Sequence, residues 1–309
     1  MKSESIDISK LIKRIKNKIQ LYVFDYDGTI FDIHDKNFDH KKAFLLIKKV
    51  LLKNNSCLIL SARCASFIDL HLKNFERVYK ENQNIKPIFI GGGNGNILYE
   101  YLNKGLIKIY DNCFSFEEAK KIMQLGKKIY EDLGISMSYL NNLGIKVHKS
   151  FLKKNWLKLI PNNFIKENKL HKGICFSEKA KVAFVLPKNI KIHKKIITLF
   201  KNKINQNLNN KFLVVKGDDM FLQISRSFKI DPKLYALKTI IKKLGLKGEQ
   251  VAVFGNMPQD NDKGILIESK LPYTFSNQKS IKKNPPYYIK FNNYSIVSSI
   301  HFFVNKMLQ

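Results

Sequence analysis

The chain has 309 residues, of which 44% are hydrophobic and 26% are charged, and its formal net charge at pH 7 is +30. With 15 glycines and 8 prolines, the composition excludes a collagen-like, low-complexity or disordered chain. No run approaches 18 consecutive apolar residues, which excludes a transmembrane helix, and the N-terminus lacks the apolar centre of a signal peptide. These features predict a soluble, cytoplasmic protein that does not bind membranes.

The positive charge comes almost entirely from lysine, because only four of the 55 cationic side chains are arginines, and the lysines are spread along the whole chain. Proteins that recognise nucleic-acid bases, or that form bidentate contacts with phosphate, preferentially use the guanidinium group of arginine. The charge therefore favours attraction of small phosphorylated anions, and nucleic-acid binding is the less favoured alternative.

The four cysteines form no CxxC pair, so we expect reduced, buried thiols and no zinc site.

Short apolar runs alternate with amphipathic segments at both ends of the chain, a pattern typical of β-α units around a parallel sheet. The predicted strands are 21–25, 57–60, 87–90 and 250–254, and the predicted helices between or after them include 39–53, 232–244 and 294–308. The middle of the chain differs. A capping box at Ser115 and Glu118 opens a helix that ends near residue 134, and short strand-like runs and a Lys-rich helix follow it.

This organisation predicts an α/β protein with one inserted domain. Residues 1–90 and 217–309 are expected to form a Rossmann-like core with a parallel sheet. Residues 91–216 are expected to form an inserted α+β domain.

Polar residues follow the first strand at the point where it ends. Asp25 and Asp27 are two positions apart directly after the apolar run LYVF, and Gly28 allows a sharp turn there. Open α/β sheets bind ligands at the carboxyl edge, so both carboxylates are expected at a binding site. An ordinary polar turn is the alternative interpretation of the same residues.

The later core strands also end in groups suited to phosphate chemistry. Ser61 follows the second strand, Lys233 opens a predicted helix, and an acidic loop at 255–262 follows the strand QVAVF. A hydroxyl and an ammonium can hold phosphoryl oxygens, and an acidic loop suits a hard cation.

The order of these segments resembles the haloacid dehalogenase (HAD) superfamily of phosphohydrolases, in particular its Cof-type branch, in which a large cap domain is inserted into the core. The resemblance rests on four motifs, which are DYDGT at 25–29, LILSAR at 58–63, KLYAL at 233–237 and FGNMPQDNDKGIL at 254–266. The segment FIGGGNGNIL at 89–98 is similar to the one where that branch begins its cap.

This resemblance implies a mechanism through an aspartyl-phosphate. Asp25 would be the nucleophile and Asp27 the general acid and base. The expected phosphate-binding residues are Ser61, Arg63 and Lys233. Mg²⁺ would be bound by Asp25, Asp27 (through its backbone carbonyl), Asn256 and Asp260. A small phosphorylated metabolite, such as a sugar phosphate, is the implied substrate.

The fourth motif departs from the family pattern GDxxNDxxML. Its first acid is replaced by Asn256, which can offer an oxygen to Mg²⁺ but no charge. Spacing from Gly255 selects Asp260 as the second acid, whereas an insertion of two residues would select Asp262 instead, and we prefer Asp260. A catalytically impaired protein that only binds a phosphorylated ligand is therefore the alternative function.

Overall fold

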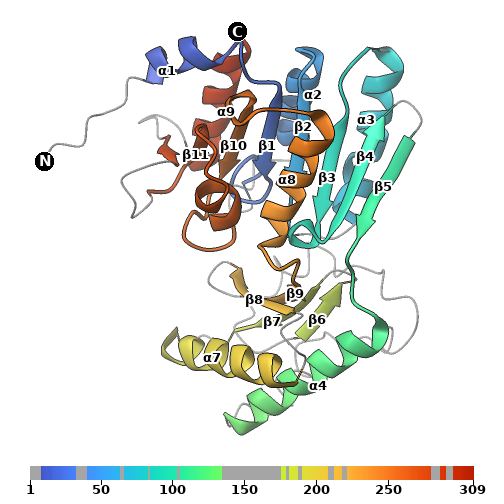
Figure 1. The fold of residues 1–309 in the computed structure, drawn as a ribbon, viewed down its shortest axis with the longest axis vertical. Coiled ribbons are helices and arrows are strands. Elements are labelled where there is room, and N and C mark those ends of the chain that lie inside the picture. Colours follow the sequence, from blue (N-terminus) through green and yellow to red (C-terminus); the bar gives the residue numbers. More distant parts are fainter. Residues whose placement is uncertain are drawn as a thin grey trace, which may run out of the picture.

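Two separate β-sheets organise the chain (Figure 1). The computed structural model describes residues 8–32, 40–62, 66–82, 84–102, 105–133, 175–178, 181–186, 190–207, 212–217, 221–279, 286–289 and 295–309. One sheet has eight strands and the other has four. Within the described ranges, no helix is long and apolar enough to cross a membrane.

The eight-stranded sheet is parallel from β12 to β3 and antiparallel in its last two strands. The strand order is β12-β11-β10-β1-β2-β3-β4-β5, so β1 occupies the interior between β10 and β2. The strands are β1 (Leu21–Asp25), β2 (Ser56–Leu60), β3 (Ile88–Gly92), β4 (Ile97–Leu102), β5 (Gly105–Asp111), β10 (Val251–Gly255), β11 (Thr274–Ser276) and β12 (Tyr287–Tyr288). All residues of β1, β2, β3 and β10 are buried, as expected of strands covered on both faces.

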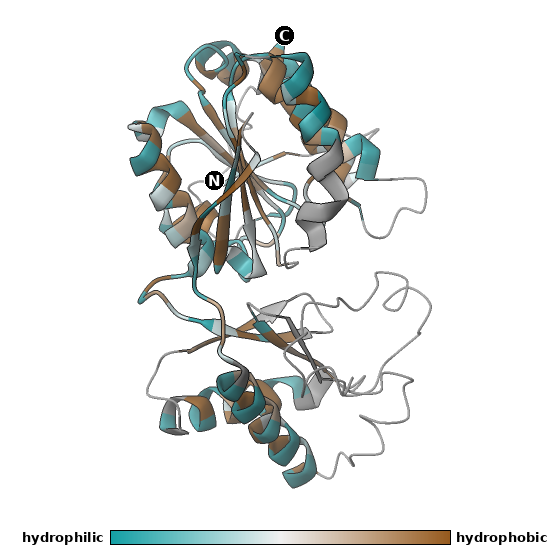
Figure 2. Ribbon diagram, turned by 90° about the vertical axis from the view of Figure 1, so that its right-hand side faces the viewer, coloured by the Kyte–Doolittle hydropathy of each residue, from teal (hydrophilic) through white to brown (hydrophobic). Residues whose placement is uncertain are grey.

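Helices cover both faces of this sheet. One apolar core joins the sheet to α1 (Ile8–Ile15), α2 (His40–Leu52), α3 (Ser66–Glu81) and α9 (Ile296–Leu308). The other core joins the opposite sheet face to α8 (Pro232–Leu244) and to a π-helical turn at Gly264–Glu268. Figure 2 shows the result, with apolar strands inside and the polar sides of the helices outside.

The second sheet is antiparallel and has the order β6-β7-β9-β8. Its strands are β6 (Cys175–Glu178), β7 (Lys181–Val185), β8 (Phe212–Gly217) and β9 (Phe221–Arg226). Helices α4 (Phe116–Asp132) and α7 (Ile190–Asn207) pack on one face and share a separate apolar core with it. Both ribbon views place this sheet between its helices and the larger sheet.

The predicted α/β core with an α+β insertion is confirmed by these two sheets. The boundaries of the insertion need a correction. Strands β4 and β5 pair with β3 and extend the large sheet, and β9 belongs to the small one. The two connections therefore lie near residues 112 and 227, where we had expected them at 90/91 and 216/217. The division into two domains stays a proposal with these revised limits.

The helix that supports the binding edge begins and ends where its sequence predicts. Asp231 caps α8, its side chain accepting a hydrogen bond from the backbone N–H of Leu234 at 2.9 Å, and Pro232 occupies the first turn. Gly245 ends the helix in the left-handed conformation. These signals fix Lys233 in the first turn of α8, at the carboxyl edge of the sheet.

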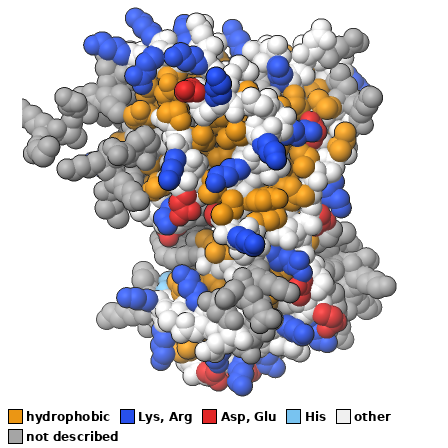
Figure 3. All heavy atoms as spheres, viewed as in Figure 1, with side chains coloured by type: hydrophobic (Ala, Val, Ile, Leu, Met, Phe, Trp, Pro, Cys, Tyr) orange, Lys and Arg blue, Asp and Glu red, His pale blue; other side chains and the backbone are white. Residues whose placement is uncertain are grey.

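On the face drawn in Figure 3, lysine and arginine side chains are distributed over both parts of the molecule and alternate with apolar groups. This distribution matches the even spread of lysine along the sequence.

Candidate active site

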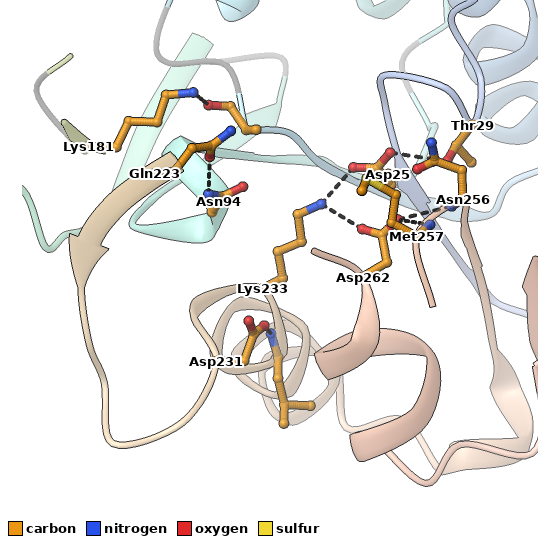
Figure 4. Close-up of polar contacts among 12 residues, drawn as sticks. Asp25, Thr29, Asn94, Lys181, Gln223, Asp231, Lys233, Asn256, Met257 and Asp262 are labelled. Atoms are coloured by element: carbon orange, nitrogen blue, oxygen red, sulfur yellow. Dashed lines mark hydrogen bonds and ion pairs between the residues drawn. The ribbon is translucent and has the colours of Figure 1, made fainter. Parts of the chain in front are cut away.

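The candidate site lies where β1, β2 and β10 end side by side. Phe24 pairs with Phe254 of β10, and Asp25 pairs with Leu60 of β2, in parallel register. The residues that follow these strands therefore meet at one edge of the sheet, as expected for a ligand site in this architecture. Helix α8 reaches the same edge with its first turn (Figure 4).

A buried ion-pair cluster occupies this edge. The Lys233 ammonium donates hydrogen bonds to Oδ1 of Asp25 and to Oδ1 of Asp262, each at 2.7 Å. Lys233 and Asp262 are fully buried and Asp25 is 4% exposed. One cation thus lies between two carboxylates, and the cluster retains a formal negative charge in a place with little water. Such a site favours the binding of a further cation.

Burial and neighbouring charges shift the pKa values of both Asp25 and Lys233. Burial raises the pKa of Asp25 to about 7, and the charges of Asp262 and Asp27 act in the same direction against the opposing effect of Lys233. Burial alone would lower the pKa of Lys233, but the charges of Asp25 and Asp262 outweigh it and raise that pKa above its ordinary value. Lys233 therefore stays protonated, while Asp25 is sensitive to any added cation.

Asp262 organises the loop that follows β10. Its Oδ2 accepts hydrogen bonds from the backbone N–H groups of Asn256 and Met257, each at 3.0 Å, and its own N–H donates to the Met257 carbonyl at 3.0 Å. Asp260, which spacing had favoured, is exposed. The turn between Met257 and Asp262 directs the Asp262 side chain inward. This geometry reverses our preference for Asp260 as the second acid of the fourth motif. Asp262 therefore replaces Asp260 among the proposed site residues.

Asn256 lies against both carboxylates. One end of its amide is 3.1 Å from Asp262 Oδ2 and 3.3 Å from Asp25 Oδ2, and only the nitrogen can donate to these acceptors. The amide is therefore assigned with its nitrogen at that end. The Thr29 hydroxyl donates to Asp25 Oδ2 at 3.1 Å from the same side. Both oxygens of Asp25 thus have hydrogen-bond donors.

Asp27 and Ser61 flank this cluster. Asp27 is half-buried in a tight turn, in which the Gly28 N–H donates to the Phe31 carbonyl at 2.7 Å. The negative charge of Asp27 contributes to the raised pKa of Asp25. Ser61 is fully buried directly after β2, and its N–H donates to the Gly91 carbonyl of β3 at 2.9 Å. Arg63 lies outside the described residues.

Two further residues at this edge were not singled out from the sequence. Thr29 contacts Asp25 as described above. Asn277 follows β11, is 4% exposed, and donates from its side-chain amide to the Gly28 carbonyl at 2.9 Å. The same edge-of-sheet argument that selected Ser61 also selects Asn277, because it directly follows the short strand β11.

The residues at the edge fit a magnesium ion. The Asp25 carboxylate and the Asp27 backbone carbonyl are hard oxygen donors, which Mg²⁺ prefers, and the Asn256 amide would have to turn its oxygen toward the ion to become a third. In the described part of the chain no cluster of three or more His, Cys, Asp or Glu side chains could hold a metal ion. A magnesium ion here would therefore depend on one carboxylate, neutral oxygens and bound water, and its charge would offset the residual negative charge of the cluster.

Replacing Gly28 with alanine is expected to disrupt the site. Gly28 has φ +78°, and an added Cβ would lie 2.2 Å from the Asn256 side-chain amide. The left-handed conformation alone costs about 1–2 kcal/mol for a residue with a Cβ. Gly245→Ala is the matched control, because it has φ +63° and open space around the new methyl group. Chemical denaturation should show a larger loss of unfolding free energy for Gly28→Ala. Equal losses in the two variants would contradict this prediction.

The sequence matches one family of hydrolases over most of its length. Residues 22–299 match the model of the haloacid dehalogenase-like hydrolases. A search of curated protein sequences returns no match.

Several solved structures share the fold. A candidate HAD/COF-like hydrolase from Plasmodium vivax is 17% identical, with 97% of this chain and 98% of that chain covered and a TM-score of 0.59. An IMP-bound IMP-nucleotidase from Plasmodium falciparum is 14% identical over 97% of this chain and 70% of its own, with a TM-score of 0.55. A haloacid dehalogenase-like hydrolase from Bacteroides thetaiotaomicron is 16% identical over 84% and 94% of the two chains, with a TM-score of 0.51. The family match extends over nearly the whole chain, including the four motifs and the insertion, so the chain belongs to the haloacid dehalogenase-like hydrolases.

Proposed function

We propose that this protein is a Mg²⁺-dependent phosphatase that hydrolyses a small phosphorylated metabolite through an aspartyl-phosphate on Asp25. The observation that carries the proposal is the buried cluster of Asp25, Lys233 and Asp262 at the carboxyl edge of the sheet. A carboxylate beside a fixed ammonium suits in-line attack on phosphorus, because the carboxylate can act as nucleophile and the ammonium can stabilise the charge on the phosphoryl oxygens. Family membership supports the hydrolase class.

In the first proposed step, a carboxylate oxygen of Asp25 attacks phosphorus and the bond to the leaving oxygen breaks. Asp27 gives its proton to that oxygen, so the alcohol leaves neutral. In the second step, Asp27 takes a proton from water, and the hydroxide attacks phosphorus and releases Asp25 and inorganic phosphate. Lys233 and Ser61 hold the phosphoryl oxygens, and Arg63 stays a proposed phosphate-binding residue. Bound Mg²⁺ would supply positive charge that lets two anions approach.

The proposed substrate class is a sugar phosphate or similar small metabolite. The supporting observation is the inserted domain, whose sheet lies next to the carboxyl edge of the large sheet (Figure 1). Because the IMP-nucleotidase structure has the same fold, IMP belongs in a substrate panel beside sugar phosphates.

The test is release of phosphate from a generic aryl phosphate and from the metabolite panel, by wild type and by Asp25→Asn, with Mg²⁺ or with EDTA. The proposal predicts turnover that requires Mg²⁺ and is lost in the variant. If no substrate is hydrolysed under any condition, the alternative gains support, namely a family member that binds a phosphorylated ligand without turnover. The neutral Asn256 in the fourth motif is the observation in favour of that alternative.

Replacing Asn256 with aspartate is expected to strengthen Mg²⁺ binding and to destabilise the metal-free protein. The new carboxylate would lie within 3.1–3.3 Å of two existing carboxylate oxygens, where the present amide donates hydrogen bonds. One added negative charge is expected to lower the Kd for Mg²⁺ by roughly tenfold, which corresponds to about 1.4 kcal/mol. Titration calorimetry measures this Kd, and thermal unfolding in EDTA measures the loss of stability.

Asn261→Asp is the control for this variant, because it adds the same charge to the same loop at a half-exposed position. We expect it to change neither the Mg²⁺ affinity nor the unfolding temperature by a comparable amount. Similar effects in both variants would show that general loop charge, rather than the position of Asn256, is responsible.

A further inference from the structure

A hydrogen bond connects the small sheet to the binding edge of the large one. The side-chain amide of Asn94 donates from Nδ2 to Oε1 of Gln223 in β9 at 2.7 Å (Figure 4). Both side chains are buried, with 4% and 7% exposed. The bond joins residues 129 positions apart and is formed between the inserted domain and the turn that follows β3.

Asn94 lies beside the proposed phosphate-binding residues. Its backbone N–H donates to the Ser61 carbonyl at 2.9 Å. The next residue, Gly95, touches the start of α8, where an added Cβ would be 2.7 Å from the Pro232 carbonyl oxygen and 3.2 Å from Lys233 Cα. The turn is therefore held between the elements that carry Ser61 and Lys233. Asn94 therefore lies between the small sheet, which it contacts through Gln223, and the residues proposed to bind phosphate.

The Asn94 side chain has an acceptor without a partner. Its Oδ1 is buried and makes no hydrogen bond with any residue that the structure describes. A buried amide oxygen in this condition is rare in native proteins, because its lost hydration is not replaced. The Asn94 backbone has φ +60°, and the bond to Gln223 fixes the amide so that this oxygen stays available.

Gln223 belongs to a polar face of the small sheet. Its neighbours in β9, Leu222 and Ile224, point into the apolar core with α4 and α7, so Gln223 points the other way, toward the large sheet. Lys181 in β7 also reaches that sheet, where its ammonium donates to the Ala62 carbonyl next to Ser61. These two links from the inserted domain therefore end on the segments that follow β3 and β2, and one of them brings a buried cation.

We propose that Asn94 and Gln223 form a subsite for a hydroxyl group of the leaving group, with Asn94 Oδ1 accepting its hydrogen bond. The acceptor and its partner are neutral amides, which suits a neutral donor. The Lys181 ammonium nearby disfavours leaving groups that carry an amine. The preferred substrates are thus phosphate esters of polyols and sugars with a hydroxyl close to the phosphate. This inference rests on the proposed phosphatase function and specifies its substrate class.

The experiment compares kcat/KM for matched substrates with and without hydroxyl groups. The pairs are glycerol 1-phosphate with propyl phosphate, and ribose 5-phosphate with pentyl phosphate. Because a site built around a hydrogen bond rejects the analogue that lacks the donor, we expect wild type to prefer the hydroxylated member by about tenfold or more in at least one pair. In Asn94→Gly, which keeps the left-handed backbone and removes the acceptor, the ratio should fall toward one.

Three further variants separate this role from a structural one. Asn54→Gly makes the same change at φ +55° in an exposed turn, and it should leave the ratio as in wild type. Asn94→Asp keeps an acceptor oxygen and should retain the preference even where its overall activity falls. Gln223→Met removes the group that anchors the Asn94 amide and should reduce the ratio.

The outcomes distinguish the two proposals. If wild type hydrolyses both members of each pair equally well, or if Asn94→Gly keeps the wild-type ratio, the subsite is overturned while the phosphatase function stands. If none of the four substrates, the aryl phosphate and IMP is hydrolysed with Mg²⁺ present, the phosphatase function fails, and the subsite fails with it.

Discussion

Replacing Lys233 with methionine is expected to lower the free energy of unfolding by about 3–5 kcal/mol at pH 7, because it leaves two buried carboxylates without their cation. Methionine approximates the length of the lysine side chain, so lost packing contributes little. The loss should be larger at pH 8 than at pH 5, because the pKa of Asp25 is about 7 and its carboxyl is already protonated in wild type at the lower pH. Urea unfolding in EDTA at both pH values measures the difference.

Two companion variants show whether charge is the cause. Lys238→Met changes an exposed lysine of the same helix and should alter stability by less than about 0.5 kcal/mol. The double variant Lys233→Met with Asp262→Asn removes one cation and one anion together. It should recover a large part of the lost stability, because only one buried carboxylate then remains. If the double variant is no more stable than Lys233→Met alone, unpaired charge does not explain the loss.

Replacing Asp25 with asparagine is expected to abolish phosphate release and at the same time to stabilise the metal-free protein. Loss of the proposed nucleophile should reduce kcat by roughly three to six powers of ten. The stabilisation has a separate cause. The pKa of Asp25 is raised to about 7 in the folded protein, compared with about 4 when unfolded, so ionising this group works against folding.

The pH dependence follows from the direction of this shift. Between pH 4 and pH 7 the unfolded chain loses the Asp25 proton while the folded protein keeps it, so the contribution of Asp25 to stability falls as pH rises through this window. Asparagine does not titrate. The stability of Asp25→Asn relative to wild type, measured in EDTA, should therefore increase from pH 4 to pH 8 and reach a few kcal/mol. A difference that stays constant with pH would contradict the raised pKa, and saturating Mg²⁺ should reduce the difference by stabilising wild type.

Local signals in the sequence were sufficient to predict the helices and strands that carry the candidate site. The limits of α8 are fixed by a capping aspartate, a proline in the first turn and a terminal glycine, all of which act within a few residues. The capping box at Ser115 and Glu118 likewise forms as predicted at the start of α4. Such signals place Asp25, Ser61 and Lys233 at strand or helix ends, and parallel pairing then brings those ends together.

Other features depended on contacts that local patterns do not contain. The hairpin of β4 and β5 was not predicted, because β5 is a partly exposed edge strand without a buried apolar run. Spacing along the chain favoured Asp260, whereas the turn after Met257 directs Asp262 toward Lys233. The bond between Asn94 and Gln223 joins distant segments and follows only from the placement of the small sheet.

The position of β1 in the middle of the large sheet has a consequence for how the protein is made. Its neighbour β10 is synthesised only after the whole insertion, although the two strands are paired throughout and Phe24 stacks on Phe254 with ring centroids 5.2 Å apart. Until residue 255 has left the ribosome, one side of β1 has no strand to pair with, and such long-range pairing forms slowly. The small sheet with α4 and α7 has its own apolar core and is complete earlier. An incomplete chain that ends before α8 contains Asp25 but neither Lys233 nor Asp262, so this candidate cluster is assembled last during biosynthesis.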